Sequence, residues 1–434
     1  MGIENSGHSH DLEGSVAPVC TDRRTLLEAA SATGAAALTA SLGGCTSFGG
    51  GDESGNVKVG VLADRSGPSS VYGIPMLNAA KLWRNEVNDS GGLLDRDVEL
   101  LSPDPQSSND RYQNHARQLI LEEEVDVLIG GITSASREAI RPIVDENQQL
   151  YVYPGLYEGG LCDEYTYVTG PVPTQQLRPL VSLMVNEFGG DIYTIAADYN
   201  FGQISAHWTR EYVEEEGGSI VGEEFVPLSV SNFDSTINRI EREDPDWVLS
   251  LLVGANHIQY FAQAESTGLD KPVGSTVQVG GSYEHKTLSP PALEDVYVSW
   301  HYMEEVPTER NQQFVNRFKE QFPDTTYVNQ NAASQYTAHQ LYQKAVERAG
   351  TTNMEEVSVE IEKGMTVEAP MGDTSVDPAT HHMTFPMWLA RVKSDHSVEF
   401  LNEGQTREPT WLQGRCNLAE ESSWDDPTTE QYTP

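Results

Sequence analysis

Five polar side chains follow apolar stretches of the sequence, at the points where strands are expected to end. Hydroxyl and amide groups of this kind hydrogen-bond polar solutes. When parallel strands lie in one sheet, the groups at their carboxyl ends face a common crevice. The pattern therefore predicts a binding site for a small polar molecule. The five residues are Ser134, Tyr153, Tyr157, Tyr199 and Gln278.

Each candidate also has a purely structural interpretation. Ser134 lies at the start of an expected helix, where its hydroxyl could serve as the N-cap. In its functional role, Ser134 would donate from its hydroxyl and backbone N–H to a solute carbonyl or carboxylate. Tyr153 and Tyr157 could be packing residues whose hydroxyls have partners inside the protein. The sequence leaves both interpretations open.

The sequence contains no Gly-x-Ser-x-Gly motif, no Walker loop and no cluster of Cys and His ligands. His381 and His382 are neighbours, and adjacent strand residues point to opposite faces, so this pair predicts packing rather than a metal site. We therefore expect no catalysis, no metal and no cofactor. A hydrolase with a chance Ser, His and Asp constellation is the alternative that the sequence leaves open.

The charge balance is strongly acidic: the 434 residues include 66 Asp and Glu against 27 Lys and Arg, a formal net charge of −39. The acidic residues are spread along the chain, so there is no basic face that could neutralise nucleic acid phosphates. Such self-repulsion disfavours a compact state in ordinary salt, whereas at molar salt the Debye length falls to about 3 Å. The composition resembles that of proteins from salt-adapted archaea and predicts a high-salt environment.

Residues 1–44 resemble a twin-arginine export signal. Arg23 and Arg24 precede an apolar, Ala-rich stretch that is too short and too polar to span a bilayer core of about 30 Å. The stretch ends in Leu-Gly-Gly-Cys, which is similar to a lipobox, so Cys45 is expected to carry lipid. Residues 45–56 would then form a Gly/Ser-rich tether to the outer face of the cell membrane. An ordinary N-terminal helix is the alternative.

The four cysteines divide by position. Cys20 lies in the expected signal and Cys45 is assigned to the lipid, which leaves Cys162 and Cys416 as a single pair. Because an exported protein matures in an oxidising compartment, we expect these two to form a disulfide. Two buried free thiols are the alternative.

The elements that must position these residues form two series. Residues 57–170 alternate short apolar stretches with amphipathic ones, which predicts a parallel sheet covered by helices on both faces. Residues 171–303 repeat the pattern after a stiff Gly-Pro-Val-Pro connector. We expect residues 304–371 to return to the first lobe and residues 372–434 to complete the second. The chain would cross between the lobes near Pro171, Met303 and Met371.

Several segments together resemble one protein family, the solute-binding receptors of ABC importers, in the branch that binds urea, short-chain amides and branched-chain amino acids. The segments are GGITSASR at 130–137, YPGLYEG at 153–159, YVTG at 167–170, PTQQ at 173–176, ADYNFG at 197–202 and EAPMG at 368–372. The resemblance runs from about residue 57 to 416 and rests on their order and spacing. It implies an α/β type I periplasmic-binding fold, in which two doubly wound parallel-sheet lobes are joined by a three-strand hinge. It also implies ABC permease subunits as partners.

The resemblance also implies which residues contact the solute: Ser134, Tyr153, Gly155, Tyr157, Tyr199, Phe201 and Gln278. Ile132 stands where urea and amide receptors usually carry an aromatic residue, which argues against urea itself. Receptors for zwitterionic amino acids place a carboxylate near the position of Gln278, because a buried ammonium needs a partner. The nearest acid here, Glu284, comes several residues later, which favours a neutral solute.

The sequence thus predicts an extracellular lipoprotein that binds urea or a short-chain amide between two lobes for an ABC importer. A branched-chain amino acid receptor of the same fold is the first alternative. An amide-responsive sensor is the second, although such sensors are cytoplasmic and the export signal argues against one. An extracellular amide hydrolase is the third.

Overall fold

The computed structural model describes residues 55–410 and 416–419. The predicted export signal, Cys45 and nearly all of the predicted tether lie outside the described residues. Within the described ranges, no helix combines the length and the apolar character needed to cross a membrane.

The first five strands lie side by side in the order β2-β1-β3-β4-β5, and all are parallel. All four residues of β3 are buried, as expected for a parallel strand that is covered on both faces. The strands are β1 (Val57–Leu62), β2 (Val98–Leu101), β3 (Val127–Gly130), β4 (Tyr151–Tyr153) and β5 (Thr166–Val168). The helices between them are α2 (Ser70–Asp89), α3 (Asn109–Leu121) and α4 (Ser134–Asn147).

A second parallel series follows in the order β10-β9-β8-β6-β7. Here β8 is the fully buried central strand. The strands are β6 (Asp191–Ala197), β7 (Ser219–Val226), β8 (Trp247–Leu251), β9 (Val273–Ser275) and β10 (Val296–Trp300). The helices are α5 (Pro173–Phe188), α6 (Asn200–Glu215), α7 (Asp234–Glu243), α8 (Ala255–Thr267) and α9 (Glu284–Thr287).

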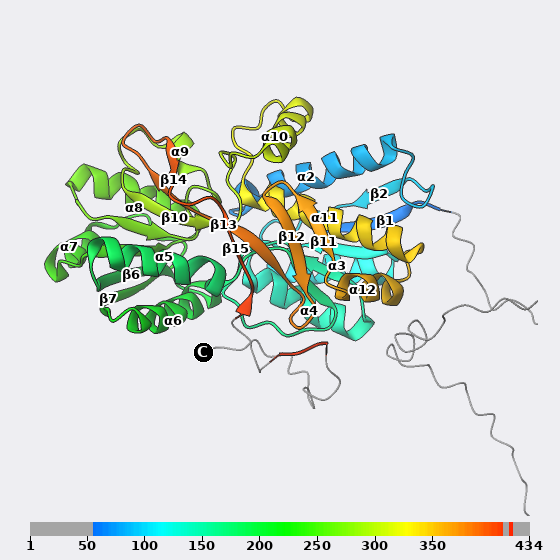
Figure 1. Cartoon of the computed structure of the whole chain (residues 1–434), viewed down its shortest axis with the longest axis horizontal. Coiled ribbons are helices and arrows are strands. Elements are labelled where there is room, and N and C mark those ends of the chain that lie inside the picture. The colour runs from blue at the N-terminus through cyan, green and yellow to red at the C-terminus, as the bar shows by residue number, and fades with distance from the viewer. Residues whose placement is uncertain (1–54, 411–415, 420–434) are drawn as a thin grey trace, which may run out of the picture. The chain divides into compact units, whose positions relative to one another are not determined.

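The chain then returns to the first series, where α11 packs against α2 and α12 (Figure 1). The returning helices are α10 (Glu309–Gln321), α11 (Gln330–Ala349) and α12 (Met354–Glu362). The remaining strands are β11 (Thr366–Ala369), β12 (Gly372–Asp377), β13 (His382–Val392), β14 (Val398–Phe400) and β15 (Gln405–Arg407). The expected α/β fold is therefore present, with a mostly parallel sheet.

Strand β13 links the two series, and this differs from the expected place of the third crossing. Its first residues pair with β5 and β12, whereas the stretch from Trp388 to Arg391 pairs with β10. The chain therefore passes between the series within β13 rather than near Met371. The β11–β12 hairpin also belongs with the first series, because β11 contacts α11 and β12 contacts α12. The other lobe boundaries given by the sequence stay a prediction.

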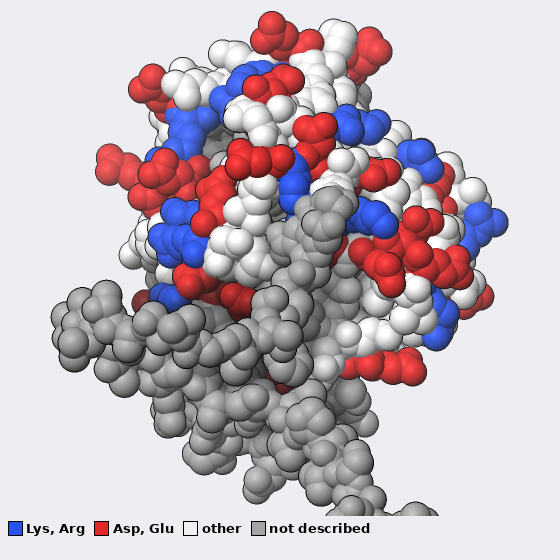
Figure 2. Space-filling model, turned by 90° about the vertical axis from the view of Figure 1, so that its right-hand side faces the viewer, with Lys and Arg blue, Asp and Glu red and all other residues white. Residues whose placement is uncertain are grey.

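Charged side chains are spread over the surface. Figure 2 shows acidic side chains interspersed with fewer basic ones on the face that it presents. The view agrees with the dispersed acidic composition of the whole sequence. It gives no support to a basic, nucleic-acid-binding face at this end of the molecule.

Cys162 and Cys416 form a disulfide in the structure, with a Cα–Cα distance of 5.8 Å across a sequence separation of 254 residues. The bond ties the C-terminal segment to the loop between β4 and β5. Replacing both cysteines by Ser should lower the free energy of unfolding by about 2–4 kcal/mol, because the unfolded chain gains freedom. Denaturant titration measures this, with chemically reduced wild type as the control. An unchanged unfolding midpoint would show that the bridge does not stabilise the fold.

Candidate functional site

A tight turn connects the end of β3 to the start of α4. Gly130 and Gly131 have φ angles of 144° and 88°, which favour glycine. A Cβ on Gly130 would lie 2.3 Å from the backbone oxygen of Leu62 on the neighbouring strand. The two glycines therefore fix where the first turn of α4 begins.

The capping role considered for Ser134 is wrong, because Thr133 is the N-cap of α4. The Thr133 side chain accepts a hydrogen bond from the Ser136 backbone N–H at 3.1 Å. The Ser136 hydroxyl in turn accepts from the backbone N–H groups of Ile132 and Thr133, both at 3.0 Å. Ser134 is the first helical residue instead. Its hydroxyl is buried and hydrogen-bonds the Glu158 carboxylate.

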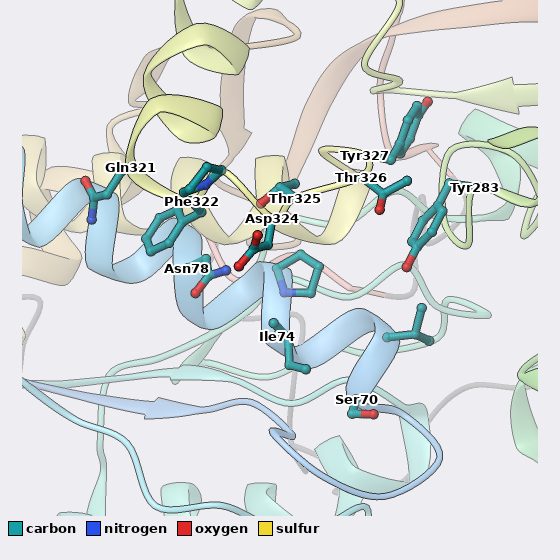
Figure 3. Close-up of a pocket in the computed structure, with 13 residues that line it drawn as sticks. Ser70, Ile74, Asn78, Tyr283, Gln321, Phe322, Asp324, Thr325, Thr326 and Tyr327 are labelled. Atoms are coloured by element: carbon teal, nitrogen blue, oxygen red, sulfur yellow. The ribbon is translucent and has the colours of Figure 1, made fainter. Parts of the chain in front are cut away.

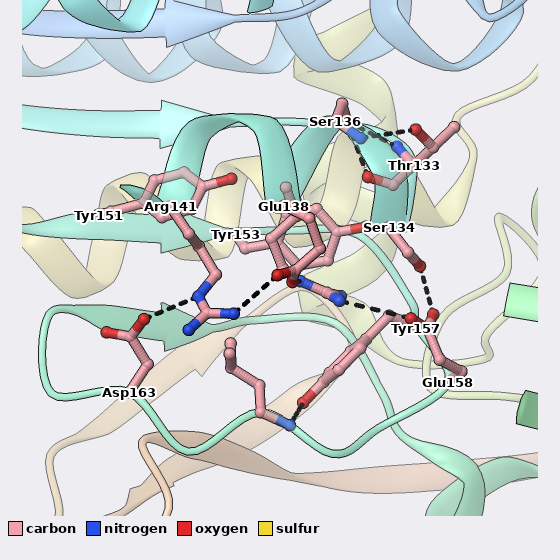
Figure 4. A network of polar contacts seen from close by, with 12 residues as sticks. Thr133, Ser134, Ser136, Glu138, Arg141, Tyr151, Tyr153, Tyr157, Glu158 and Asp163 are labelled. Carbon is pink, nitrogen blue, oxygen red and sulfur yellow. Dashed lines mark hydrogen bonds and ion pairs between the residues drawn. The ribbon is translucent and has the colours of Figure 1, made fainter. Parts of the chain in front are cut away.

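Glu158 belongs to a buried ionic network that Figure 4 displays. Neither Glu158 nor Arg137 exposes its side chain, and Arg137 Nη2 lies 3.4 Å from Glu158 Oε1. The Arg137 guanidinium also lies over the rings of Tyr153 and Tyr157, at 5.2 and 4.3 Å from their centroids. Burial alone would lower the pKa of Arg137, but the charges of Glu158 and Glu138 hold it above its ordinary value. The Ser134 hydroxyl is therefore hydrogen-bonded to one member of a buried ion pair, Glu158 with Arg137.

The two predicted tyrosines of the first series are fully buried. The Tyr153 hydroxyl donates to the Ile132 backbone oxygen at 3.1 Å. The Tyr157 hydroxyl contacts His382 Nε2 at the start of β13 and accepts from the Leu161 backbone N–H at 3.3 Å. Burial lowers the pKa of His382 to about 4, so this ring is neutral at ordinary pH. Tyr157 thus joins the first series to β13.

Gly155 lies beside the Tyr153 hydroxyl. A Cβ at position 155 would come within 2.4 Å of that oxygen and 3.1 Å of the Ile132 backbone oxygen. A side chain at this position would therefore break the Tyr153–Ile132 hydrogen bond.

Tyr199 approaches the same region from the second series. It precedes α6 and is half-buried, and its ring lies 6.1 Å from that of Phe201. Burial raises the pKa of Tyr199 well above its ordinary value, and the negative charge of Glu158 raises it further, followed by Tyr153. Tyr199 packs against the hydrophobic cluster that contains Tyr153 and Tyr157. Phe201 is buried in the hydrophobic core, so packing accounts for it.

Gln278 is engaged elsewhere. Its Nε2 lies 3.0 Å from the Leu252 backbone oxygen and 2.9 Å from His257 Nδ1, and its Oε1 accepts from the Ser275 hydroxyl. The hydrogen-bonding capacity of this side chain is therefore largely taken up within the second series. A solute contact by Gln278 stays a prediction.

Glu284, the first acidic residue after Gln278, also has partners within the protein. Glu284 is fully buried, with Oε1 2.9 Å from His257 Nε2 and Oε2 accepting from the Val279 backbone N–H at 2.8 Å. Burial alone would raise the pKa of Glu284, but His257 holds it below its ordinary value. A solute ammonium would have to compete with His257 for this carboxylate.

Sequence reasoning missed three buried polar residues, Asn256, Tyr72 and Ser282. Asn256, the second residue of α8, is 2% exposed, and neither side-chain Oδ1 nor Nδ2 has a partner among the described residues. The Tyr72 hydroxyl lies 3.3 Å from the Ser282 hydroxyl, which connects α2 with the loop after β9. Burial raises the pKa of Tyr72 to about 12. Asn256 follows β8, so the strand-end rule applied to that strand would have found it.

A separate cavity of about 440 Å³ lies between the start of α2, segment 321–327 and Tyr283 (Figure 3). Its lining includes Ile74, Phe322 and Asp324. None of the predicted solute-binding residues lines it, so this cavity is not the predicted site.

Comparison with known proteins agrees with this architecture. A family model described as "Periplasmic binding protein" matches residues 56–397. "Leu/Ile/Val-binding protein homolog 6" of Brucella melitensis is 23% identical over 359 residues, which cover 81% of this chain and 92% of that protein.

Two solved structures have the same fold. A solute-binding protein of an ABC transporter from R. palustris, in complex with 4-hydroxybenzoate, is 21% identical with a TM-score of 0.73, covering 82% of this chain and 98% of its own. A branched-chain amino acid transporter substrate binding protein from Streptococcus pneumoniae, in complex with isoleucine, is 18% identical with a TM-score of 0.71, covering 80% and 99%. The chain therefore belongs to the periplasmic binding protein family and has the type I periplasmic-binding fold.

Proposed function

We propose that this chain binds a neutral amide-type solute, urea or a short-chain amide, at the strand ends of the two series. It then delivers the solute unchanged to the permease subunits of an ABC importer. The groups that would face the solute are Ser134, Tyr153 and Tyr199, together with Asn256.

The unpartnered amide of Asn256 carries this proposal. A buried amide without hydrogen bonds is costly, so it is expected to meet a partner when the site is filled. Its two atoms offer one acceptor and one donor group, which complement a neutral amide. The nearby acid Glu284 is already paired with His257, which favours a neutral solute over a zwitterion.

A branched-chain amino acid receptor is the second candidate. It is favoured by the name of the Brucella relative and by the isoleucine in the Streptococcus structure. Calorimetry in molar salt with acetamide, urea, leucine and 4-hydroxybenzoate separates the candidates. We expect acetamide or urea to bind with the lowest dissociation constant. Tighter binding of leucine would establish the second candidate instead.

An amide hydrolase would release ammonia. Incubating the purified chain with acetamide should yield no ammonia above the level of a heated control. Release in proportion to protein concentration would overturn the proposal that the solute leaves unchanged.

Tyr199→Ala should weaken acetamide binding by about 1–3 kcal/mol, because it removes apolar surface that the solute would bury. Calorimetry measures the dissociation constant, and circular dichroism checks the fold. Phe225→Ala is the control, because Phe225 is an exposed aromatic residue on β7 of the same series. Equal dissociation constants for wild type and Tyr199→Ala would remove Tyr199 from the site.

We also propose that the two series form lobes that close on the solute. The chain would bend near Pro171, near Met303 and within β13, where it passes from one series to the other. Small-angle scattering should show a smaller radius of gyration with saturating solute. An identical radius with bound solute would contradict closure.

The twin-arginine route and the lipid on Cys45 complete the proposal. They rest on Arg23, Arg24 and the Leu-Gly-Gly-Cys sequence. Cys45→Ser should release the exported chain from the membrane fraction into the medium. A variant that stays membrane-bound would rule out the lipid anchor at this residue.

A further inference from the structure

The hydroxyl of Ser134 has a fixed hydrogen-bond direction. A serine hydroxyl has one proton to donate and two lone pairs that accept. Its partner is Glu158, which is buried and paired with Arg137 (Figure 4). An ionised carboxylate only accepts, so the Ser134 proton is directed to Glu158. The Ser134 oxygen is left with lone pairs alone for any further partner.

The groups beside Ser134 also leave hydrogen-bond acceptors rather than donors available to a solute. The Tyr153 hydroxyl donates to the Ile132 backbone oxygen, which can only accept, so the Tyr153 oxygen also retains lone pairs. The backbone N–H groups of Ile132 and Thr133 are directed to the Ser136 hydroxyl. Several donors around the start of α4 are therefore already in use.

The helix dipole at the start of α4, in contrast, favours an anion. The first turn of a helix carries roughly half a positive elementary charge, which attracts carboxylates. Glu158 carries a full negative charge and is hydrogen-bonded to the very hydroxyl that a solute would meet. A second carboxylate at Ser134 would face oxygen lone pairs and this charge, whereas an N–H group would be attracted by both.

We infer that Glu158 makes Ser134 a hydrogen-bond acceptor toward the solute, so that the site selects carboxamide or urea N–H groups over carboxylates. Glu158 is a specificity-determining positioning residue that acts through Ser134. The inference rests on the proposed function, since it assumes that the solute reaches Ser134. It replaces the donor role that the sequence suggested for the Ser134 hydroxyl.

Matched ligand pairs test this directly. Acetamide and acetate, and likewise benzamide and benzoate, share a shape but differ in offering N–H or O⁻. Calorimetry in molar salt should show at least tenfold tighter binding of the amide in one or both pairs. Glu158→Gln places an amide at position 158 that can donate to Ser134, which frees the serine proton for the solute. We expect the amide-to-acid preference to fall about five- to tenfold, as for one hydrogen bond.

Glu215→Gln is the matched control. It makes the same change in an exposed residue of α6 that pairs with Arg178, and it should leave the preference unchanged. If Glu158→Gln fails to fold by circular dichroism, Ser134→Ala provides the second test. It removes the acceptor, so amide affinity should fall about fivefold while acid affinity does not.

Three results would overturn the inference. The wild type could bind the acid of a pair more tightly than its amide. The folded Glu158→Gln variant could keep the wild-type preference, or Ser134→Ala could weaken amide and acid alike. Either of the two variant results, with amides still binding the wild type, would leave the proposed function standing. Binding of none of the four ligands and no urea would instead overturn the proposed function, and the inference with it.

Discussion

Arg137→Met should lower the free energy of unfolding by about 3–5 kcal/mol, because it leaves Glu158 buried without its cationic partner. Both side chains are fully buried, so water cannot replace the lost ion pair. The change also removes the stacking of the guanidinium on Tyr153 and Tyr157. Denaturant unfolding in molar salt measures the loss.

Arg310→Met is the matched control. Arg310 pairs with Asp373 at 2.8 Å, but the two side chains are 40% and 69% exposed. A solvated ion pair of this kind contributes less than about 1 kcal/mol. The double variant Arg137→Met with Glu158→Gln should recover part of the loss, since it removes the unpaired charge. If Arg137→Met costs no more than Arg310→Met, the buried network does not stabilise the fold.

Acidification from pH 7 to pH 5 should cost about 6 kcal/mol through three buried histidines. Burial lowers the pKa values of His301 and His339 to about 3 and that of His382 to about 4. An unfolded histidine titrates near 6.5, so below that pH the unfolded chain binds protons that the folded chain does not. Each histidine then removes about 1.4 kcal/mol of stability per pH unit, until its folded pKa is reached.

A variant isolates this effect from the titration of the many carboxylates. His339 stacks on Trp83 with a centroid distance of 4.6 Å, and Phe can occupy the same place without a titrating group. His339→Phe should lose about 2 kcal/mol less than wild type between pH 7 and pH 5. Unfolding free energies at the two pH values supply the comparison. Parallel pH dependence of the two proteins would show that the pKa of His339 is the same in the folded and the unfolded chain.

The elements with strong local signals could be predicted from the sequence. The apolar run at residues 57–62 predicts a strand and the stretch at residues 330–349 predicts a helix, and both match the structure at both ends. Buried parallel strands are short apolar runs, and their pattern is local. The apolar residues 388–392 predict a strand, which is part of β13, but they do not predict which strands it pairs with. Its partners β5 and β10 lie far away in the sequence, so no local pattern reports the pairing.

The candidate site was predicted in part. The strand-end rule selected Ser134, Tyr153 and Tyr199, and in the structure Tyr199 packs against the hydrophobic cluster that contains Tyr153. It gave the possible capping role to Ser134 rather than Thr133, because both carry hydroxyls and the glycine turn before them sets the start of α4. Likewise, no local pattern could predict that Ser134 hydrogen-bonds Glu158, which lies 24 residues further along the chain.

For a similar reason, the sequence could not predict that the Gln278 side chain already has hydrogen-bond partners within the protein. Its partner His257 lies in α8, and only the fold brings the two side chains together. The same packing occupies Glu284 and leaves Asn256 without a partner among the described residues. A sequence shows which groups can bind a solute, whereas the fold determines which of them are already bound to each other.

A crystal structure of the chain grown with acetamide or urea in molar salt tests the central claim most directly. We expect solute density between the Ser134–Glu158 pair and Tyr199, with a solute nitrogen within hydrogen-bonding distance of the Ser134 oxygen and a hydrogen bond from the solute to the Asn256 amide. Solute density confined to the cavity beside Ile74 and Phe322, or a site beside Ser134 that stays empty at saturating solute, would contradict it.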